Sequence, residues 1–320
     1  MITSEYQQER IVRVAAIQMV AELGNMKKNL DQAKFLAKQA INQGAQLVVL
    51  PEFFTSAVAF NRRLLSCIQP LDGPAMELLK DVANEGQALV AGSYMASRGG
   101  HVYNTLVVAT PDGKTFLHDK DQPTMWENCY YTGGGDPGIL TTELGRLGAV
   151  LCWEFIRSRT ARRLFNQVDM VIGGSCWWTG TEEAITKNPQ ANLQNIELLH
   201  NSPGRMARIL GVPVVHASHA GICNGFSPPD ESRPYNSHFL GETQIVDGEG
   251  KILKYMTYED GAGVITADIT LGVVADKTEA IPDSFWIPEL PEISLRLWDE
   301  LNRFGESYYH DITLPYLHLS

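Results

Sequence analysis

The sequence lacks any uncharged apolar run approaching the ~18 residues that a bilayer-spanning helix needs. Residues 1–10 are polar and do not show the basic-then-apolar order of a secretory signal peptide. Basic residues are also few, because 26 Lys and Arg stand against 37 Asp and Glu and leave a net charge of −11. Proteins that bind nucleic acid or anionic membranes need a basic face. We therefore expect neither nucleic acid nor a membrane as a partner.

Cysteine is scarce, and its pattern does not suggest pairing. The five cysteines are odd in number, well scattered, and include no Cys-x-x-Cys motif. They are Cys67, Cys129, Cys152, Cys176 and Cys223. This usage argues against a disulfide framework and favours reduced thiols in a cytoplasmic protein.

The composition supplies enough apolar material for a large core. The 320 residues are 44% hydrophobic and 20% charged, which is typical of a globular protein. Short β-branched runs alternate with longer helical patterns, which predicts an α/β class with layered sheets and helices. No linker or low-complexity stretch interrupts the pattern, so we predict one domain over residues 1–290. Residues 291–320 form an extension whose aromatic tail, 308–317, must be buried on its own subunit or on another.

Periodicity and turn residues locate the individual elements. The predicted strands are 11–19, 46–50, 147–151, 170–173 and 212–217, with hairpins at 105–117 and 242–255. The predicted helices are 26–41, 74–83, 160–165, 193–200 and 293–304, with a separate turn at 205–210.

Reactive side chains follow directly after several predicted strands. Glu52 follows the strand 46–50, Lys120 follows the first hairpin, and Cys152 follows the strand 147–151. Loops at the carboxyl ends of strands converge over a rigid base, which is where chemistry collects in such sheets. Taken singly, each residue has a plainer explanation, since exposed charges and inert buried cysteines are common.

Together, these residues and their contexts resemble the nitrilase (carbon–nitrogen hydrolase) superfamily. Leu-Pro-Glu at 50–52, Lys120 in Asp-Lys-Asp-Gln-Pro-Thr, and Leu-Cys-Trp-Glu at 151–154 stand in that family's order. The likeness runs from residues 15–19 to the hairpin at 241–250. It implies a four-layer α-β-β-α sandwich, a Glu52–Lys120–Cys152 triad, and an assembly of at least two copies. It also implies that Glu127 is a second glutamate that orients the lysine or the substrate.

The implied chemistry is hydrolysis of a small-molecule nitrile or amide, with release of ammonia and without a metal or organic cofactor. A thiolate on Cys152 attacks the carbon, Lys120 stabilises the thiolate and the oxyanion, and Glu52 exchanges protons. The backbone N–H of Trp153 would be a second oxyanion donor. Trp153, Trp177 and Trp178 also flank these strand ends, where they could line an apolar pocket or simply pack in the core.

The branch of the family stays open. Cys-Trp-Glu at 152–154 and the Lys-x-x-Pro-Thr-x-x-Glu spacing across 120–127 favour nitrilases, whereas Phe-Phe-Thr-Ser-Ala after Leu-Pro-Glu does not. Aliphatic amidases and N-carbamoyl-amino-acid hydrolases therefore remain alternatives. A non-catalytic binding module with the same fold is a further one, although an intact Glu–Lys–Cys set argues against it.

Three other groups of residues could have a functional role. The residues His216, His219, Cys223 and His238 could form a metal site, although His216 and His219 would point to opposite faces of a continuing strand. A papain-like pair of Cys152 with a histidine would leave Glu52 and Lys120 without a role. The arginines Arg157, Arg159, Arg162 and Arg163 form either a solvated helix face or a contact to a substrate carboxylate.

Overall fold

The computed structural model describes residues 10–273 and 276–319, so nearly all of the polar segment in which we predict no signal peptide lies outside the described residues. The strands are β1 (Ile11–Met19), β2 (Leu47–Val49), β3 (Gln69–Pro70), β4 (Leu89–Arg98), β5 (His101–Ala109), β6 (Thr115–Asp119), β7 (Ile139–Thr142), β8 (Gly145–Leu151), β9 (Met170–Ser175), β10 (Val214–His219), β11 (Ile222–Phe226), β12 (Pro234–His238), β13 (Thr243–Val246), β14 (Ile252–Met256) and β15 (Gly263–Thr270). The helices are α1 (Met26–Asn42), α2 (Pro74–Gly86), α3 (Ser158–Leu164), α4 (Glu182–Lys187), α5 (Pro189–Leu210), α6 (Glu292–Tyr308) and α7 (Leu314–Leu319). Short helical turns are η1 (Arg62–Cys67), η2 (Met125–Cys129), η3 (Cys152–Ile156), η4 (Tyr258–Asp260) and η5 (Tyr309–Thr313).

Two mixed sheets form the centre of the molecule. In the first, β1, β2 and β4 run parallel, β5 and β6 extend it as antiparallel hairpin partners, and β15 runs antiparallel to β1. In the second, β8, β9 and β10 run parallel, flanked by β7 and by β13–β14. The sheets join where the end of β1 pairs with the end of β10, at Gln18 and Ser218.

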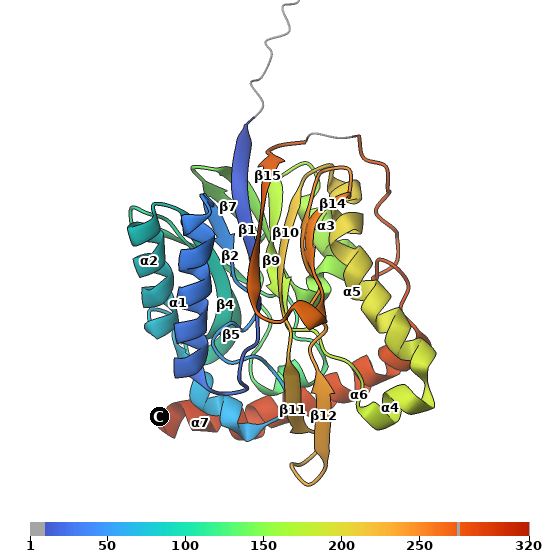
Figure 1. Ribbon diagram of the computed structural model, residues 1–320. Coiled ribbons are helices and arrows are strands. Elements are labelled where there is room, and N and C mark those ends of the chain that lie inside the picture. The colour runs from blue at the N-terminus through green and yellow to red at the C-terminus, as the bar shows by residue number, and fades with distance from the viewer. Residues whose placement is uncertain (1–9, 274–275, 320) are drawn as a thin grey trace, which may run out of the picture.

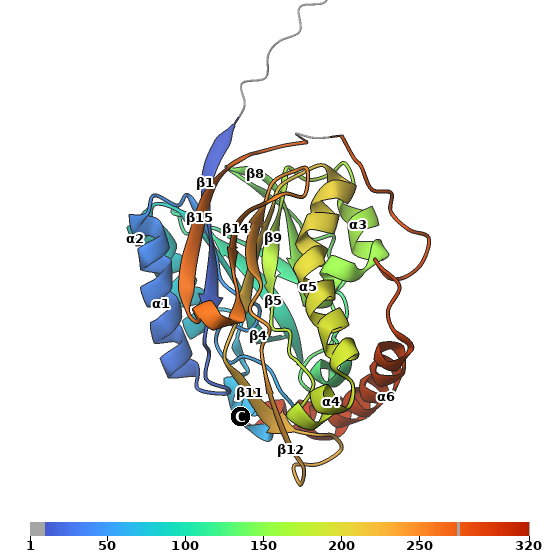
Figure 2. The same cartoon turned by 45° about the vertical axis from the view of Figure 1, so that its right-hand side comes forward.

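Side-chain alternation along the strands separates the layers of the fold. In β1, Val14 and Ala16 belong to the core between the sheets, whereas Ala15 and Ile17 pack against α1 and α2. In β9, Ile172 faces the space between the sheets and Val171 faces α3 and α5. Figures 1 and 2 show α1 and α2 on one outer face and α3 and α5 on the other. The predicted α-β-β-α sandwich is confirmed.

Helix α5 corrects one prediction. We expected a helix over 193–200 and a separate turn at 205–210, but the structure has one continuous helix, with Pro203 inside it. Proline lacks the N–H that would bond to the carbonyl of residue 199. The hydroxyl of Ser202 donates to that carbonyl at 3.0 Å, so the helix continues without an unpaired acceptor.

Strand β4 shows why some strands escaped prediction. Its first eight residues are buried on both faces, so the sequence has no polar–apolar alternation to reveal a strand. The strands β3, β7, β11, β12 and β15 were also not predicted.

The C-terminal tail packs on its own chain. Figure 1 shows α6 and α7 crossing the lower end of the molecule, beneath the sheets. Tyr309 is buried there, and its hydroxyl accepts a hydrogen bond from the Val102 backbone at 3.1 Å. The tail's aromatic content therefore has an intramolecular explanation.

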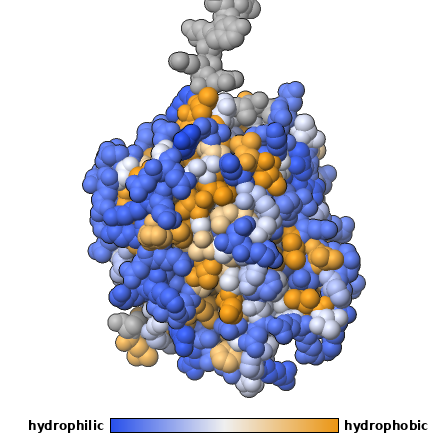
Figure 3. All heavy atoms as spheres, in the orientation of Figure 1, coloured by the Kyte–Doolittle hydropathy of each residue, from blue (hydrophilic) through white to orange (hydrophobic). Residues whose placement is uncertain are grey.

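Hydrophobic side chains also reach the surface. Figure 3 shows them as a band over β14 and β15, where Ile252, Leu253, Val264 and Ile265 are only partly buried. Among the described residues, no helix combines the length and apolar character that a membrane span requires.

Candidate active site

Glu52 lies at the carboxyl end of β2, fully buried between the two sheets. One carboxylate oxygen, Oε1, accepts hydrogen bonds from Lys120 Nζ and Asn104 Nδ2, both at 2.9 Å. The other, Oε2, accepts one from the backbone N–H of Cys176 at 3.0 Å. Because these donors come from three separate segments, inside β5 and directly after β6 and β9, the Glu52 carboxylate has a fixed orientation.

Lys120 and Glu127 reach the same point from the loop after β6. Lys120 is fully buried, and its Nζ donates to Glu127 Oε2 at 2.7 Å as well as to Glu52. That Glu127 oxygen also accepts hydrogen bonds from the Thr124 backbone at 3.0 Å and the Tyr131 hydroxyl at 2.5 Å. Glu127 Oε1 is buried and has no hydrogen-bond partner among the described residues. One ammonium is thus held between two carboxylates, one of which keeps a free acceptor.

Cys152 stands at the sharp turn from β8 into η3. Its φ of +51° lies in the left-handed region that non-glycine residues rarely adopt, so the turn holds Cys152 in a strained conformation. Glu52, Glu127 and Cys152 each offer an atom, and these atoms lie within 4.8 Å of one another. Such a set could ligate a metal, but Lys120 already supplies a cation bonded to both carboxylates. The structure thus brings together the four residues that the sequence singled out.

Glu154 ties the cysteine turn to the lysine loop. Its Oε2 accepts hydrogen bonds from the Leu151 backbone at 2.8 Å and from His118 Nε2 at 3.1 Å. Its Oε1 accepts them from the Asp121 backbone at 3.2 Å and from Arg163 at 3.1 Å. Leu151 and Asp121 are the immediate neighbours of Cys152 and Lys120, so Glu154 holds the two loops at a fixed separation.

The charges of the site are set by burial and by mutual attraction. Burial raises the pKa of Glu52 from 4.5 to about 7, although Lys120 opposes the shift. Burial alone would lower the pKa of Lys120, but the charges of Glu127 and Glu52 raise it well above its usual value. Burial and the charge of Glu52 raise the pKa of the Cys152 thiol well above its usual value, against the attraction of Lys120. The resting cysteine is therefore a thiol, and Glu52 is the neighbouring base that titrates near neutrality.

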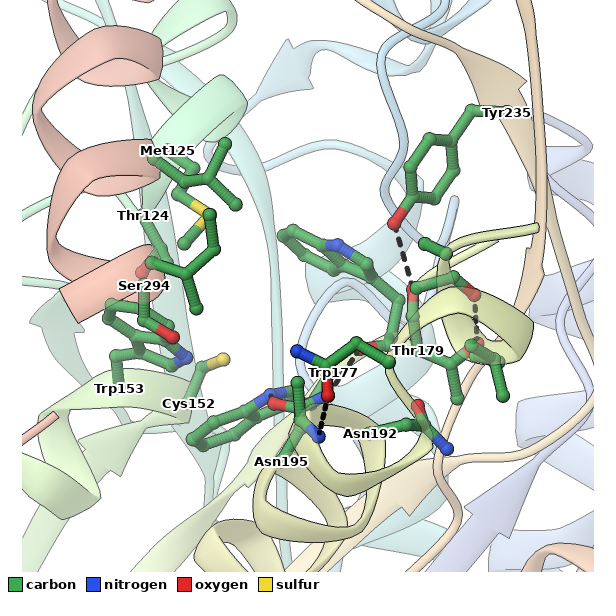
Figure 4. A pocket seen from close by; sticks show the side chains of 18 residues that line it. Thr124, Met125, Cys152, Trp153, Trp177, Thr179, Asn192, Asn195, Tyr235 and Ser294 are labelled. Atoms are coloured by element: carbon green, nitrogen blue, oxygen red, sulfur yellow. Dashed lines mark hydrogen bonds between the residues drawn. The ribbon is translucent and has the colours of Figure 1, made fainter. Parts of the chain in front are cut away.

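A pocket leads to Cys152 from the lower end of the molecule. Figure 4 shows the Cys152 sulfur pointing into the space that Trp153, Trp177 and Met125 surround. Trp178, which we predicted as a pocket residue, also lines this space. Asn195 braces the wall, because its side chain accepts a hydrogen bond from Trp177 Nε1 at 2.8 Å and donates one to the Trp178 carbonyl at 3.0 Å.

The C-terminal extension contributes to this site. Ile293, Ser294 and Leu297 of α6 line the pocket. Further along α6, Asn302 accepts a hydrogen bond from Asn128 Nδ2 at 2.8 Å, next to Glu127 in η2. The pattern of residues 291–320 gave no sign of this contribution.

The histidines of β10 have partners that leave no common metal site. Strand β10 continues through His219, so His216 and His219 do face opposite sides. His216 donates from Nδ1 to the Glu242 carbonyl at 3.0 Å and accepts from the Ser175 hydroxyl at 2.8 Å. His219 donates from Nε2 to the Glu52 carbonyl at 2.7 Å, which makes it a support for the glutamate turn. Burial lowers the pKa of each histidine to about 4, so both are neutral.

The arginines after Cys152 agree with our predicted solvated helix face only in part, because Arg159 and Arg162 are exposed whereas Arg157 is fully buried. Arg157 is fully buried, pairs with Asp121, and lies 5.2 Å from the ring centre of Trp298. Arg163 pairs with Glu154, and Arg162 lies on the surface near Asp283. Arg157 and Arg163 thus belong to neither a solvated face nor a carboxylate site, because Asp121 and Glu154 already pair with them.

Several residues of the site gave no usable signal in the sequence. Asn104 lies inside a strand, and Tyr131 follows η2 as one aromatic residue among many. His118 directly precedes Asp119 and Lys120, and it bonds Asp136 through Nδ1 at 2.7 Å. Only Glu154 had a local signal, because it completes the Cys-Trp-Glu motif.

Comparison with known proteins adds an independent observation. A family model described as carbon-nitrogen hydrolase matches residues 13–278. The chain is similar to a nitrilase of Pyrococcus abyssi (strain GE5 / Orsay), with 34% identity over 161 residues, which cover 48% of this chain and 60% of that protein. It is also similar to the omega-amidase NIT2 of Xenopus tropicalis, with 30% identity over 277 residues, 80% of this chain and 87% of that protein.

The fold has solved relatives as well. The crystal structure of a carbon-nitrogen hydrolase from Helicobacter pylori G27 superposes with a TM-score of 0.70 at 19% identity and covers 95% of each chain. At that identity the likeness concerns the fold alone. The alignment with the Pyrococcus protein spans less than two thirds of that protein's length.

Proposed function

This chain belongs to the carbon-nitrogen hydrolase family, and from that premise we propose that it hydrolyses a nitrile or a small amide through a thioester on Cys152, with release of ammonia. The observation that carries the proposal is the Lys120 ammonium, held between the Glu52 and Glu127 carboxylates beside the Cys152 thiol. A thiol, a base that titrates near neutrality and a fixed cation are the groups that acyl transfer through cysteine needs.

In the first half of the proposed reaction, Glu52 accepts the thiol proton while the Cys152 sulfur attacks the substrate carbon. With an amide, negative charge develops on the carbonyl oxygen, where Lys120 and the backbone N–H of Trp153 stabilise it. Glu52 then gives the proton to the departing nitrogen, so that ammonia leaves and a thioester remains. A nitrile first forms a thioimidate, which must add one water before ammonia leaves.

In the second half, Glu52 takes a proton from the water that attacks the thioester. The carbonyl–sulfur bond breaks, the proton returns to the Cys152 sulfur, and a carboxylic acid is released. Glu127 does not exchange protons in this scheme. Its Oε2 holds Lys120, and its unpartnered Oε1 accepts a hydrogen bond from an N–H of the substrate or intermediate.

Nitrile and amide substrates each have an observation in their favour. The motifs around Lys120 and Cys152 favour the nitrilase branch, and a nitrilase is among the relatives. The free acceptor on Glu127 favours a primary amide, because a nitrile has no N–H to donate. We propose the nitrile as the first candidate and the amide as the second. N-carbamoyl amino acids have less support, because Arg157 and Arg163 are already paired.

We further propose that residues 1–290 form the hydrolase domain, with 291–320 as an extension that completes the pocket wall. A homodimer or larger assembly also stays a proposal. Its support is the apolar band over β14 and β15, a surface of the kind that a second copy would cover (Figure 3). Size-exclusion chromatography with light scattering tests it, and a monomer would contradict it.

The mechanism is tested by trapping the covalent intermediate. In Glu52→Gln the side chain keeps its shape but accepts no proton, so the thioester should form slowly and fail to hydrolyse. Intact-protein mass spectrometry with a good substrate should then detect an acyl group on Cys152. Cys152→Ala is the matched control and should neither acylate nor turn over. Normal turnover by Cys152→Ala, or an acyl group on another cysteine, would refute the proposal.

A further inference from the structure

Aromatic rings form the walls of the pocket above Cys152. The rings of Trp153 and Trp177 lie with their centres 5.7 Å apart, and Trp153 stacks on Trp298 at 5.3 Å with 7° between the planes. Trp178 stacks on Trp126 at 4.5 Å with 18° between the planes. Because Trp126 covers one face of Trp178, the other face is left to the pocket that Trp178 lines. Exposed indole faces of this kind bind flat apolar groups.

No charged side chain lines this pocket in the described part of the chain. The cations around the reacting groups are already paired, Lys120 with Glu52 and Glu127, and Arg157 with Asp121. A substrate carboxylate in the pocket would therefore be buried without a counter-charge, which is strongly unfavourable. The pocket thus discriminates against anionic substrates.

The polar groups of the pocket wall are neutral. Asn192 Oδ1 and Thr124 Oγ1 are buried, and neither has a hydrogen-bond partner among the described residues. A neutral donor on the substrate, such as an amide N–H or a hydroxyl, would satisfy Asn192 Oδ1. A carboxylate could accept a hydrogen bond from the Thr124 hydroxyl, but it has no hydrogen to donate to Asn192 Oδ1, and none of these neutral groups would balance its charge.

The size of the pocket limits the substrate further. Its volume is about 200 Å³, and an apolar cavity of about 150 Å³ is known to hold benzene. The space is therefore sufficient for one six-membered ring and a short linker to the reacting carbon. We infer that the site selects an uncharged nitrile or primary amide whose side chain ends in a single aromatic ring, and that it rejects the monoamides of dicarboxylic acids. This inference rests on the proposed function and adds the substrate class to it.

The experiment compares kcat/KM for three substrates of each reacting group, measured by ammonia release. For amides they are 3-phenylpropionamide, glutaric acid monoamide and propionamide, and the corresponding nitriles form the second series. In whichever series is hydrolysed, we expect kcat/KM for the phenyl substrate to exceed kcat/KM for the substrate with a carboxylate by about 100-fold or more. It should exceed kcat/KM for the short aliphatic substrate by about 10-fold or more. An equal or higher kcat/KM for the acid, or for the short aliphatic substrate, would overturn the inference.

A charge added to the pocket wall provides the second test. Asn192→Arg should supply the missing cation and raise kcat/KM for the acid relative to the phenyl substrate by about 10-fold or more. Gln190→Arg adds the same charge to an exposed position of α5 outside the pocket, so it should leave the ratio unchanged. An unchanged ratio in folded Asn192→Arg would count against the inference. Should no nitrile or amide be hydrolysed or acylate Cys152 at all, the proposed function fails and the substrate class falls with it.

Discussion

Replacing Glu127 with glutamine should lower the pH at which the enzyme becomes active. Glu127 and Glu52 share the Lys120 ammonium, with N–O distances of 2.7 and 2.9 Å. Glutamine keeps the shape of the side chain but removes one negative charge. The repulsion on the Glu52 carboxylate is then lifted and Lys120 pairs with Glu52 alone, so the pKa of Glu52 should fall.

The size of the shift follows from the geometry. Atoms of Glu52 and Glu127 lie within 4.8 Å of each other, and two unit charges at that distance repel by about 3 kcal/mol at an effective dielectric constant of about 20. That energy corresponds to about 2 pKa units. Since Glu52 must be ionised to accept the thiol proton, kcat/KM should rise with pH through the pKa of Glu52, which is about 7 in the parent protein. In Glu127→Gln the rise in kcat/KM should move down by about 2 pH units, to about pH 5.

The maximal activity of Glu127→Gln should change as well. Lys120 loses one of its two anchors, so stabilisation of the oxyanion weakens and kcat should fall by about 100-fold or more. The assay is ammonia release from about pH 3.5 to about pH 9, with Asp268→Asn as the matched control. That variant removes a surface carboxylate paired with Arg13 and should leave the rise in kcat/KM unmoved. If the rise in kcat/KM of Glu127→Gln stays at the same pH or moves to higher pH, the reasoning is refuted.

Three further substitutions test the supporting structure. Burial would lower the pKa of His118, but its carboxylate partners raise it from 6.5 to about 9, so its contribution to stability is present below pH 6.5 and is lost as the pH rises through 9. Urea denaturation should show that His118→Gln lowers the free energy of unfolding by about 3 kcal/mol at about pH 6 and by much less at about pH 10. An equal decrease at both pH values would contradict this. A Cβ on Gly305 would lie 2.5 Å from a side-chain carbon of η2, whereas one on Gly135 meets nothing within 4 Å. Gly305→Ala should therefore lower kcat and the melting temperature, whereas Gly135→Ala, the control, should change neither. Equal kcat and equal melting temperatures in the two variants would show that this contact is unimportant. Arg157→Met should destabilise the fold by about 3–5 kcal/mol in denaturant titrations, because Asp121 keeps a buried charge without a partner, and a neutral effect would mean that the pair is dispensable.

The grouping of the candidate site residues could be predicted because their signals are local. Glu52, Lys120 and Cys152 each follow an apolar strand, and strand ends bring side chains to one edge of a sheet whatever the rest of the chain does. Most helices and many strands were predictable for the same reason, since alternation, proline and glycine act over a few residues. The strands β3, β4, β7, β11, β12 and β15 were not predicted. The layer order α-β-β-α came from the family resemblance rather than from the pattern.

The tertiary structure alone decided the protonation states and the hydrogen-bond and ion-pair partners of the buried groups. Arg157 has the sequence pattern of a solvated charge, because its counter-charge Asp121 lies 36 residues away and only the fold brings them together. The resemblance suggested a cysteine thiolate, whereas the complete burial of Cys152 raises the pKa of its thiol well above the usual value and favours the protonated form. Helix α6 and the open face of Trp178 belong to the pocket through contacts across the chain that no local pattern encodes. A sequence shows which side chains are available at a strand end, but desolvation and long-range pairing, which set their charge, exist only once the chain is folded.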